Sequence, residues 1–279
     1  MMPQNLADEV AALAADHGAE WTEVVGDALL EQDFPAIHAV GRASVHPPRL
    51  LDLQWGDPAA PRVTLVGKGV CFDSGGLDLK PAAGMRMMKK DMGGAAHVLG
   101  IASMIMGTGL PVRLRVLISA VENAVSGNSY RPGDLVPTRA GLFVEIDNTD
   151  AEGRVILSDA LALGGADNPE VMIDFATLTG AARVALGTEL PAFFTNDDAL
   201  AEGLATSAAA VDDPLWRLPL HQPYNELIES KVGDIMNGSA GPFGGAITAA
   251  LFLEHFVPDG VAWGHFDIMA WNCLLYTTP

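Results

Sequence analysis

The stretch Leu142–Leu163 reads LFVEIDNTDAEGRVILSDALAL, in which a polar motif lies between two apolar runs. Residues 142–146 are predicted to form a strand and residues 155–163 the helix that follows the motif. Asp150, Glu152 and Arg154 recur at every second position, so an extended backbone would project them to one side. Because neighbouring carboxylates repel each other, a bound divalent cation is one reason to keep them together.

A structural role explains the same motif without a metal. Thr149 and Glu152 stand three residues apart before an apolar run, which is the pattern of a capping box at the start of a helix. Acidic residues also favour the first turn of any helix. Taken alone, this is the simpler explanation, so the metal hypothesis depends on further ligands elsewhere in the chain.

The composition limits the classes of function. The chain has 279 residues, of which 49% are hydrophobic, and a formal net charge of −19. This acidity argues against nucleic acid or an anionic membrane as a partner. Two cysteines, Cys71 and Cys273, make no disulfide framework. With no signal peptide and no apolar run of membrane-spanning length, a cytoplasmic protein is expected.

Apolar strands alternate with helical segments along the chain. Val63–Val66 is an apolar run typical of a buried parallel strand. This alternation predicts an α/β protein with three layers (α/β/α), in which helices cover both faces of a mixed, largely parallel central sheet. Nothing divides the chain, so residues 1–279 are expected to form one domain. Further strands are predicted at 112–121, 171–175 and 261–268, and further helices at 93–106 and 246–256.

The apolar strand Val63–Val66 leads into a glycine-rich segment, GKGVCFDSGG, at residues 67–76. Four glycines in ten residues predict a loop that approaches another group closely. It is not a P-loop, because Arg62 and Gly69 stand where that motif needs Gly and Ser or Thr. It is not a dinucleotide-binding fingerprint either, because Phe72 replaces the third glycine.

Chemically active groups follow three of the predicted strands: charged side chains follow two of them, and the backbone of Thr177–Gly180 follows the third. In open α/β sheets, sites form at the carboxyl ends of strands, so these residues are expected to meet. Four carboxylates would neutralise two divalent cations, which is the arrangement of a co-catalytic pair about 3.5–4 Å apart. Oxygen ligands suit Zn, Mn or Mg. No two histidines lie at ligand spacing, and His97 is interpreted as a structural or surface residue. The residues in question are Lys68, Asp73, Lys80 and Asp91, then Asp150, Glu152 and Arg154, then Thr177–Gly180.

Five segments in this order resemble the leucine (cytosol) aminopeptidase family of dinuclear metallopeptidases. They are VGKGVCFDSGG at 66–76, Lys80, MKKDMGGAA at 88–96, NTDAEGR at 148–154 and TLTGA at 177–181. The resemblance covers nearly the whole chain from about Asn5 and corresponds to the family's catalytic domain. By the same comparison, we expect this sequence to lack the family's N-terminal domain and to stop before the glycine-rich strand and helix that usually close the catalytic domain.

The resemblance implies a role for each site residue. Lys68, as a neutral amine, would bind the tighter metal together with Asp73, Asp91 and Glu152. Asp73, Asp150 and Glu152 would bind the more exchangeable one. Lys80 would polarise the scissile carbonyl, and Arg154 would hold a bicarbonate that acts as general base. The Leu178 N–H would help bind the tetrahedral intermediate. Met88, Thr177 and Gly180 would line the pocket for the first side chain, with Met269 as a further candidate.

These roles imply an aminopeptidase that removes N-terminal residues, preferably leucine-like ones, from peptides with a free α-amine. The family also implies assembly into hexamers. One alternative is another dinuclear hydrolase such as a phosphoesterase, in which Lys80 and Arg154 would hold phosphate. A second is DNA binding, which the acidity and the missing N-terminal domain argue against.

Overall fold

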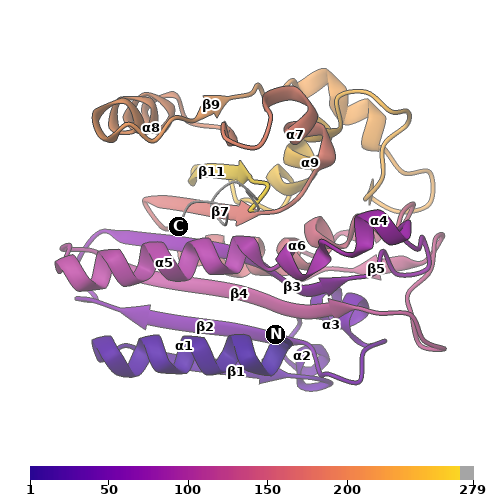
Figure 1. Ribbon diagram of the computed structural model, residues 1–279, viewed down its shortest axis with the longest axis horizontal. Coiled ribbons are helices and arrows are strands. Elements are labelled where there is room, and N and C mark those ends of the chain that lie inside the picture. The colour runs from indigo at the N-terminus through magenta and orange to yellow at the C-terminus, as the bar shows by residue number, and fades with distance from the viewer. Residues whose placement is uncertain (271–279) are drawn as a thin grey trace.

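The computed structural model describes residues 1–270, and Figure 1 shows a central sheet with helices on both sides. Within these residues the main sheet has eight strands in the order β1-β2-β4-β3-β7-β11-β8-β9, and a smaller sheet has the order β10-β6-β5. The predicted α/β class is confirmed. The strands are β1 Glu20–Val25, β2 Arg49–Trp55, β3 Arg62–Asp73, β4 Arg113–Asn123, β5 Leu135–Pro137, β6 Phe143–Glu145, β7 Val171–Ala176, β8 Ala192–Thr195, β9 Trp216–Arg217, β10 Ile235–Met236 and β11 Ala262–Asp267.

The middle of the main sheet is parallel and its flanks are mixed. Strands β4, β3, β7 and β11 are parallel neighbours. Strand β2 runs antiparallel to both β1 and β4, and β8 runs antiparallel to β11. The carboxyl ends of the parallel strands lie at one edge, where α/β proteins place their sites. Since Gly67 pairs with Phe175, the last six residues of β3 extend past its pairing with β7 into this region.

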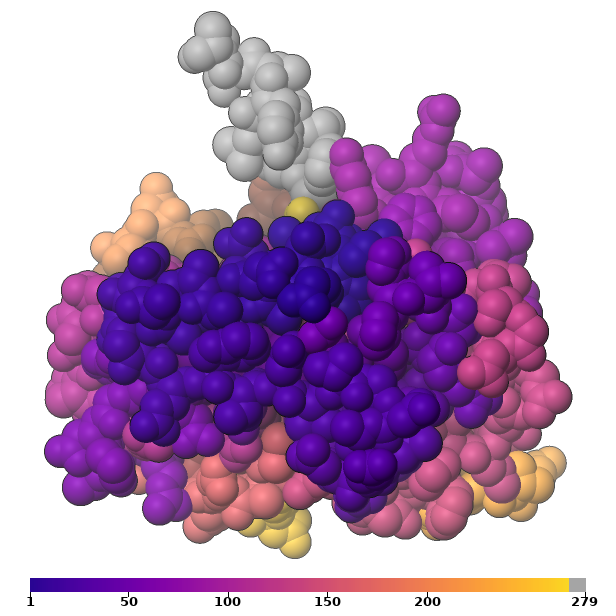
Figure 2. Space-filling view, turned by 90° about the horizontal axis from the view of Figure 1, so that it is seen from below, coloured from indigo at the N-terminus to yellow at the C-terminus, as the bar shows by residue number. Residues whose placement is uncertain are grey.

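Helices cover both faces of the sheet and bury its apolar side chains. On one face, α1 and α5 pack on the strands through residues such as Leu6 and Val98. On the other, α3, α6 and α9 pack through residues such as Ile37 and Ile156. Figure 2 shows the N-terminal segment, in indigo, over most of the face seen from below. The helices are α1 Pro3–His17, α2 Ala28–Glu31, α3 Pro35–Gly41, α4 Ala82–Met85, α5 Gly93–Thr108, α6 Glu152–Ala166, α7 Gly180–Leu186, α8 Asp198–Val211 and α9 Gly245–Glu254, with 3₁₀ helices η1 Met88–Lys90 and η2 Gln222–Ile228.

Most of the glycine-rich segment is strand, and the loop prediction was wrong for residues 67–73. Strand β3 continues to Asp73, paired with β4 and interrupted only by a register shift between Val70 and Phe72. Glycine is needed at 67 for packing, because a Cβ there would lie 2.8 Å from the Cα of Ala95 in α5. The hydrogen-bonding partner strand therefore decides the local conformation, and the glycine lets a helix approach closely.

The strand before the motif does not belong to the main sheet. Strand β6 pairs with β5 and β10 in the smaller sheet, so only β3 and β7 of the three predicted strand ends lie in the main one. The motif at 148–154 still reaches the same edge, because α6 packs against β3 and β4. Packing of the helix, rather than the preceding strand, thus positions the motif.

The first helix, α1, has a local signal at each end. Gly18 ends it in the left-handed conformation. Asn5 lies in its first turn, where its Oδ1 accepts from the N–H of Met2 at 2.9 Å. Cys71 is buried and free, and Cys273 lies outside the described residues. Among residues 1–270, no helix combines the length and the apolar character needed to cross a membrane.

Helix α3 was not predicted, because the group that caps it is far away in sequence. Phe34 precedes it and offers no capping side chain. Asp159 of α6, which is fully buried, accepts instead from the N–H groups of Ala36 and Ile37, at 2.9 and 3.1 Å. Its second oxygen accepts from the N–H of Arg139 at 2.8 Å. One carboxylate therefore joins α3, α6 and the loop before β6.

Replacing Asp159 with alanine should lower the free energy of unfolding by at least about 3 kcal/mol. Three backbone donors would lose their acceptor, and an unpaired buried donor costs about 1–3 kcal/mol. Urea denaturation monitored by circular dichroism measures the change. Asp159→Asn is the matched variant and should lose less, because its amide oxygen still accepts. Equal stability of Asp159→Ala and the wild-type protein would contradict this role.

Candidate metal centre and active site

Lys68 lies at the centre of the site, on β3, and is only 3% exposed. Its ammonium contacts Asp91 Oδ2 at 2.8 Å and Glu152 Oε1 at 2.9 Å. It also donates to the carbonyl oxygen of Thr177 at 2.9 Å. This side chain therefore joins three segments: the residue after η1, the first residue of α6 and the turn after β7.

Lys80 forms the second half of the cluster. Its Nζ lies 2.7 Å from Asp73 Oδ2 and 2.5 Å from Asp150 Oδ1. Carboxylate oxygens of Asp73, Asp91 and Glu152 lie within 4.8 Å of one another, close enough to share a metal ion. The structure thus brings together Lys80 and the five predicted metal ligands, although these roles stay predictions.

Neutral side chains orient the carboxylates. Asn123, at the end of β4, donates through Nδ2 to Asp73 Oδ1 at 2.9 Å and to the carbonyl oxygen of Thr149 at 3.0 Å. Thr177 donates through its hydroxyl to Asp91 Oδ1 at 2.7 Å. Such supporting hydrogen bonds are the usual means of fixing ligands around a metal. Asn123 was missed from the sequence, where it stood only as the start of a loop.

The motif is neither extended nor a capping box. Helix α6 begins at Glu152, and Ala151 precedes it without a side-chain cap. The Thr149 hydroxyl donates to the carbonyl oxygen of Gly75 at 2.6 Å, while the Glu152 carboxylate faces Lys68. Both side chains are therefore turned towards the site. Gly153 makes this approach feasible, because a Cβ there would lie 2.5 Å from the Lys68 Cε.

The electrostatics of the cluster reflect crowded negative charge. Burial, followed by the charge of Asp73, raises the pKa of Asp150 to about 6 and the pKa of Glu152 well above its ordinary value. Burial lowers the pKa of Lys68, but the carboxylates of Asp91 and Glu152 outweigh it and leave that pKa above its ordinary value. The two lysines therefore act as counter-ions, yet they do not balance the four carboxylates.

The donor set fits hard divalent cations. Asp91 Oδ2, Asp150 Oδ1 and Glu152 Oε1 are buried and accept no well-directed hydrogen bond within residues 1–270, although each faces a lysine ammonium. Buried carboxylate oxygens without a neutral hydrogen-bond donor need a cation beside them, either a lysine ammonium or a metal ion. Four carboxylates and a lysine from separate segments provide ligands that Zn, Mn or Mg accept.

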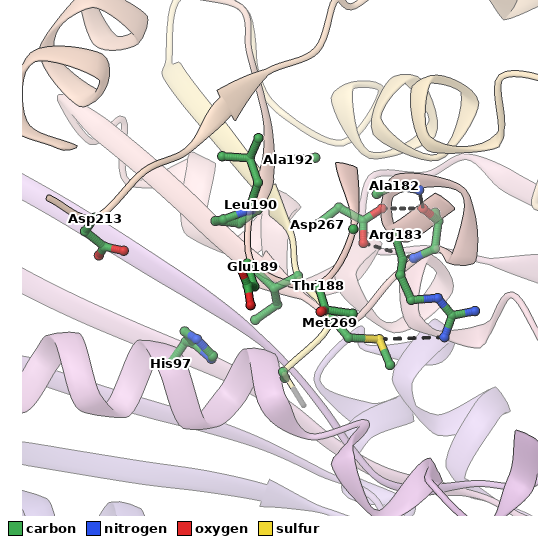
Figure 3. Close-up of a pocket in the computed structure, with 15 residues that line it drawn as sticks. His97, Ala182, Arg183, Thr188, Glu189, Leu190, Ala192, Asp213, Asp267 and Met269 are labelled. Atoms are coloured by element: carbon green, nitrogen blue, oxygen red, sulfur yellow. Dashed lines mark hydrogen bonds between the residues drawn. The ribbon is translucent and has the colours of Figure 1, made fainter. Parts of the chain in front are cut away.

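A cavity of about 200 Å³ lies beside the cluster. Its lining includes the predicted pocket residues Met88, Thr177, Leu178, Gly180 and Met269 together with Lys68, Asp73, Lys80, Asp91 and Asp150. The site residues and the expected substrate pocket thus share one space. Figure 3 shows a larger cavity, of about 590 Å³, that adjoins it around Arg183 and Met269.

The Leu178 N–H is not free in the structure. Asp267, at the end of β11, accepts from it at 3.1 Å and from the Thr179 N–H at 3.0 Å. It also accepts from the Thr179 hydroxyl at 2.5 Å. The predicted contact of Leu178 with a tetrahedral intermediate stays a prediction, and it would compete with Asp267. Sequence reasoning missed Asp267, because only the fold brings β11 beside the turn after β7.

Arg154 is buried and, like Glu152, is not among the described residues that line the smaller cavity. It is 9% exposed, and its Nη1 donates to the carbonyl oxygen of Asn237 at 2.8 Å. Its Nε has no partner within residues 1–270. Burial lowers its pKa to about 10. A buried guanidinium with an unused donor is suited to a small anion.

Asn237 holds the motif at 148–154 from the neighbouring segment, and no sequence pattern pointed to this role. Its fully buried side chain accepts from the N–H groups of Asp147 and Asn148, at 2.8 and 3.1 Å. It donates to the carbonyl oxygens of Asn148 and Ala151, at 2.7 and 3.3 Å. One amide therefore holds the turn that leads into Asp150 and Glu152.

Replacing Asn237 with alanine should weaken both stability and metal binding. We expect a loss of about 2–4 kcal/mol in the free energy of unfolding, because buried backbone groups lose their partners. Affinity for Mn²⁺ should fall about 10- to 100-fold, as for other supporting residues of metal sites. Urea titration and calorimetric titration with Mn²⁺ measure the two effects. Asn128→Ala, at an exposed position, is the control and should change neither.

Comparison with known proteins agrees with this geometry. The model of the cytosol aminopeptidase family's catalytic domain matches residues 1–277. A probable cytosol aminopeptidase of Syntrophotalea carbinolica is 45% identical over 97% of this chain and 55% of its own length. Peptidase B of Serratia proteamaculans is 44% identical over 96% of this chain and 64% of its own. The chain therefore spans between about half and two thirds of the length of these relatives.

Solved structures of the same family also match this chain. Cytosol aminopeptidase from Coxiella burnetii matches with a TM-score of 0.95 and 60% identity, over 98% of this chain and 59% of that one. The bottromycin maturation enzyme BotP, solved in complex with Mn, matches with a TM-score of 0.91 and 42% identity, over 96% of this chain and 59% of that one. The resemblance noted in the sequence is confirmed, and the chain belongs to the cytosol aminopeptidase family.

Proposed function

We propose that this chain is the catalytic unit of a metal-dependent aminopeptidase that releases N-terminal residues from peptides. The observation that carries the proposal is the buried cluster of four carboxylates around Lys68 and Lys80, beside a cavity at the carboxyl edge of the sheet. The names of the relatives, cytosol aminopeptidase and peptidase B, support it. The family match gives no support to the phosphoesterase alternative.

Lys68, Asp73, Asp91, Asp150 and Glu152 would hold two divalent cations. When bound, such a pair supplies an activated water and polarises a carbonyl group. Zn or Mn are the expected metals, with Mg as a third option, and the Mn complex of BotP supports Mn. The observation in favour of this assignment is that three buried carboxylate oxygens face lysine ammonium groups and accept from no neutral donor within residues 1–270.

Lys80 would stabilise the oxyanion that forms from the scissile carbonyl. Its side chain is 15% exposed and lies at the rim of the cluster, held by Asp73 and Asp150. A fixed ammonium aimed at developing negative charge lowers the barrier without the reorganisation that water would need. Arg154 would hold a bicarbonate as general base for the attacking water, in agreement with the unused Nε donor of its buried guanidinium.

Met88, Thr177, Gly180 and Met269 would surround the first side chain of the substrate, since they line the same cavity as the carboxylates. We further propose that the chain works in the cytoplasm, as the names of its relatives suggest, and that it assembles into hexamers. Its partners would be peptides with a free N-terminus.

The test is hydrolysis of leucyl-4-nitroanilide before and after removal of metal. We expect turnover that o-phenanthroline abolishes and that Mn²⁺ or Zn²⁺ restores. N-acetyl-leucyl-4-nitroanilide should not be cleaved, because its α-amine is blocked. Activity that survives exhaustive metal removal would overturn the proposal. Turnover of 4-nitrophenyl phosphate without cleavage of any aminoacyl amide would establish the phosphoesterase alternative instead.

A further inference from the structure

Two cationic side chains line the small cavity but have no part in the proposed chemistry. They are Lys90, the last residue of η1, and Arg183 on α7. Both share the cavity with Met88, Thr177 and Met269, which would contact the substrate's first side chain. An apolar pocket for leucine needs no cation, so the presence of Lys90 and Arg183 in this cavity has to be explained in another way.

Lys90 is buried and has no close partner among residues 1–270. Its side chain is 9% exposed, and the nearest carboxylate oxygen, Asp91 Oδ1, is 3.8 Å away, which is too far for a hydrogen bond. Asp91 is already engaged by Lys68 at 2.8 Å and by Thr177 at 2.7 Å. A charge taken out of water in this way favours an incoming anion.

Arg183 stands at the junction of the two cavities. Its Nη1 contacts Met269 Sδ at 3.8 Å, and no ion pair of Arg183 is found within residues 1–270 (Figure 3). The acidic residues nearest in the picture do not neutralise it. Asp267 is engaged by the turn at Thr179, and Glu189 lies on the other side of Met269. The planar guanidinium is therefore available for a carboxylate, which it binds in a two-pronged geometry.

We propose that Lys90 and Arg183 determine specificity by pairing with the side-chain carboxylate of an N-terminal aspartate or glutamate. The inference rests on the proposed function, since it assigns the substrate class of the same pocket. Without a substrate, Lys90 lacks a close counter-ion and Arg183 lacks any within the described residues. An acidic side chain would supply one to both, whereas leucine or glutamine would leave them unpaired. The enzyme should therefore prefer acidic N-terminal residues to neutral ones of the same shape.

The experiment compares kcat/KM for the 4-nitroanilides of glutamate, glutamine, aspartate, asparagine and leucine. Glutamate and glutamine have nearly the same shape, so their ratio isolates the charge. Arg183 is exposed, so the larger effect is expected from the buried Lys90 side chain. The wild-type ratio should be at least about 10, the value of one charge-assisted hydrogen bond to a buried group. Lys90→Met and Arg183→Met should each lower the ratio several-fold. Lys231→Met, at an exposed position away from the cavities, should leave it unchanged.

A charge reversal makes the test sharper. Arg183→Glu should shift the preference towards lysyl and arginyl anilides. A measurement that needs no variant supports this: free glutamate should inhibit leucyl-anilide hydrolysis by the wild-type enzyme more strongly than free glutamine does. A wild-type ratio near 1, or a high ratio that neither methionine variant lowers, would overturn the inference and leave the proposed function standing. If no aminoacyl anilide is cleaved at all, the proposed function itself fails.

Discussion

Replacing Asp150 with alanine is expected to remove at least one metal ion and to reduce kcat/KM by more than about 100-fold. Loss of a residue that only supports a metal ligand already costs 10- to 100-fold, so loss of a ligand should cost more. Asp150 is well suited to the test because its side chain is 32% exposed. Lys80 would keep Asp73, at 2.7 Å, as its counter-ion, so the fold should survive the change.

The measurement combines metal analysis of the purified variant with leucyl-anilide kinetics. Asp150→Asn keeps the shape and removes the charge, and it should lose nearly as much activity. Asp198→Ala, on the exposed surface of α8, is the matched control for the loss of an acidic group. Full metal content with normal turnover in Asp150→Ala would show that the carboxylate cluster is not the catalytic centre.

The sequence was informative where a residue's role follows from its immediate neighbours. The strands that flank the site were found because their apolar runs are long and bounded by polar residues. The predicted metal ligands were selected because they belong to short motifs of unusual charge density, and the structure brings them together. Lys68 could be placed at the edge of the sheet because it follows a buried strand directly, and the structure puts it at the centre of the cluster.

Contacts across the fold were beyond the reach of sequence reasoning. The glycines at 67 and 69 predicted a loop, but pairing with β4 keeps that segment extended. Helix α3 had no visible start, since its cap comes from Asp159, more than a hundred residues later in the chain. Asn237 had no motif around it, although it holds the turn before α6. Each of these roles depends on a partner far away in sequence.

Replacing Arg154 should separate the two proposed tasks of the site, which are metal binding and general-base catalysis. We expect Arg154→Ala to keep both metals and to lower kcat about 100-fold or more, which is the contribution typical of general-base catalysis. The reason is geometric. Its guanidinium contacts the carbonyl oxygen of Asn237 rather than any of the four carboxylates, and its unused Nε is available for an anion. Metal analysis and steady-state kinetics of the purified variant measure the two effects.

Bicarbonate provides the discriminating control. In buffer freed of carbon dioxide, added bicarbonate should stimulate the wild-type enzyme and should leave Arg154→Ala unaffected. Arg154→Lys should retain part of the response, because its ammonium keeps the charge but loses the planar fork. If Arg154→Ala loses its metals, the residue belongs to the metal-binding structure, and the role of anion holder is wrong. A third outcome is that Arg154→Ala keeps its metals and responds to bicarbonate as the wild-type enzyme does. The anion would then be held elsewhere, because the variant differs from the wild type only in the missing guanidinium side chain.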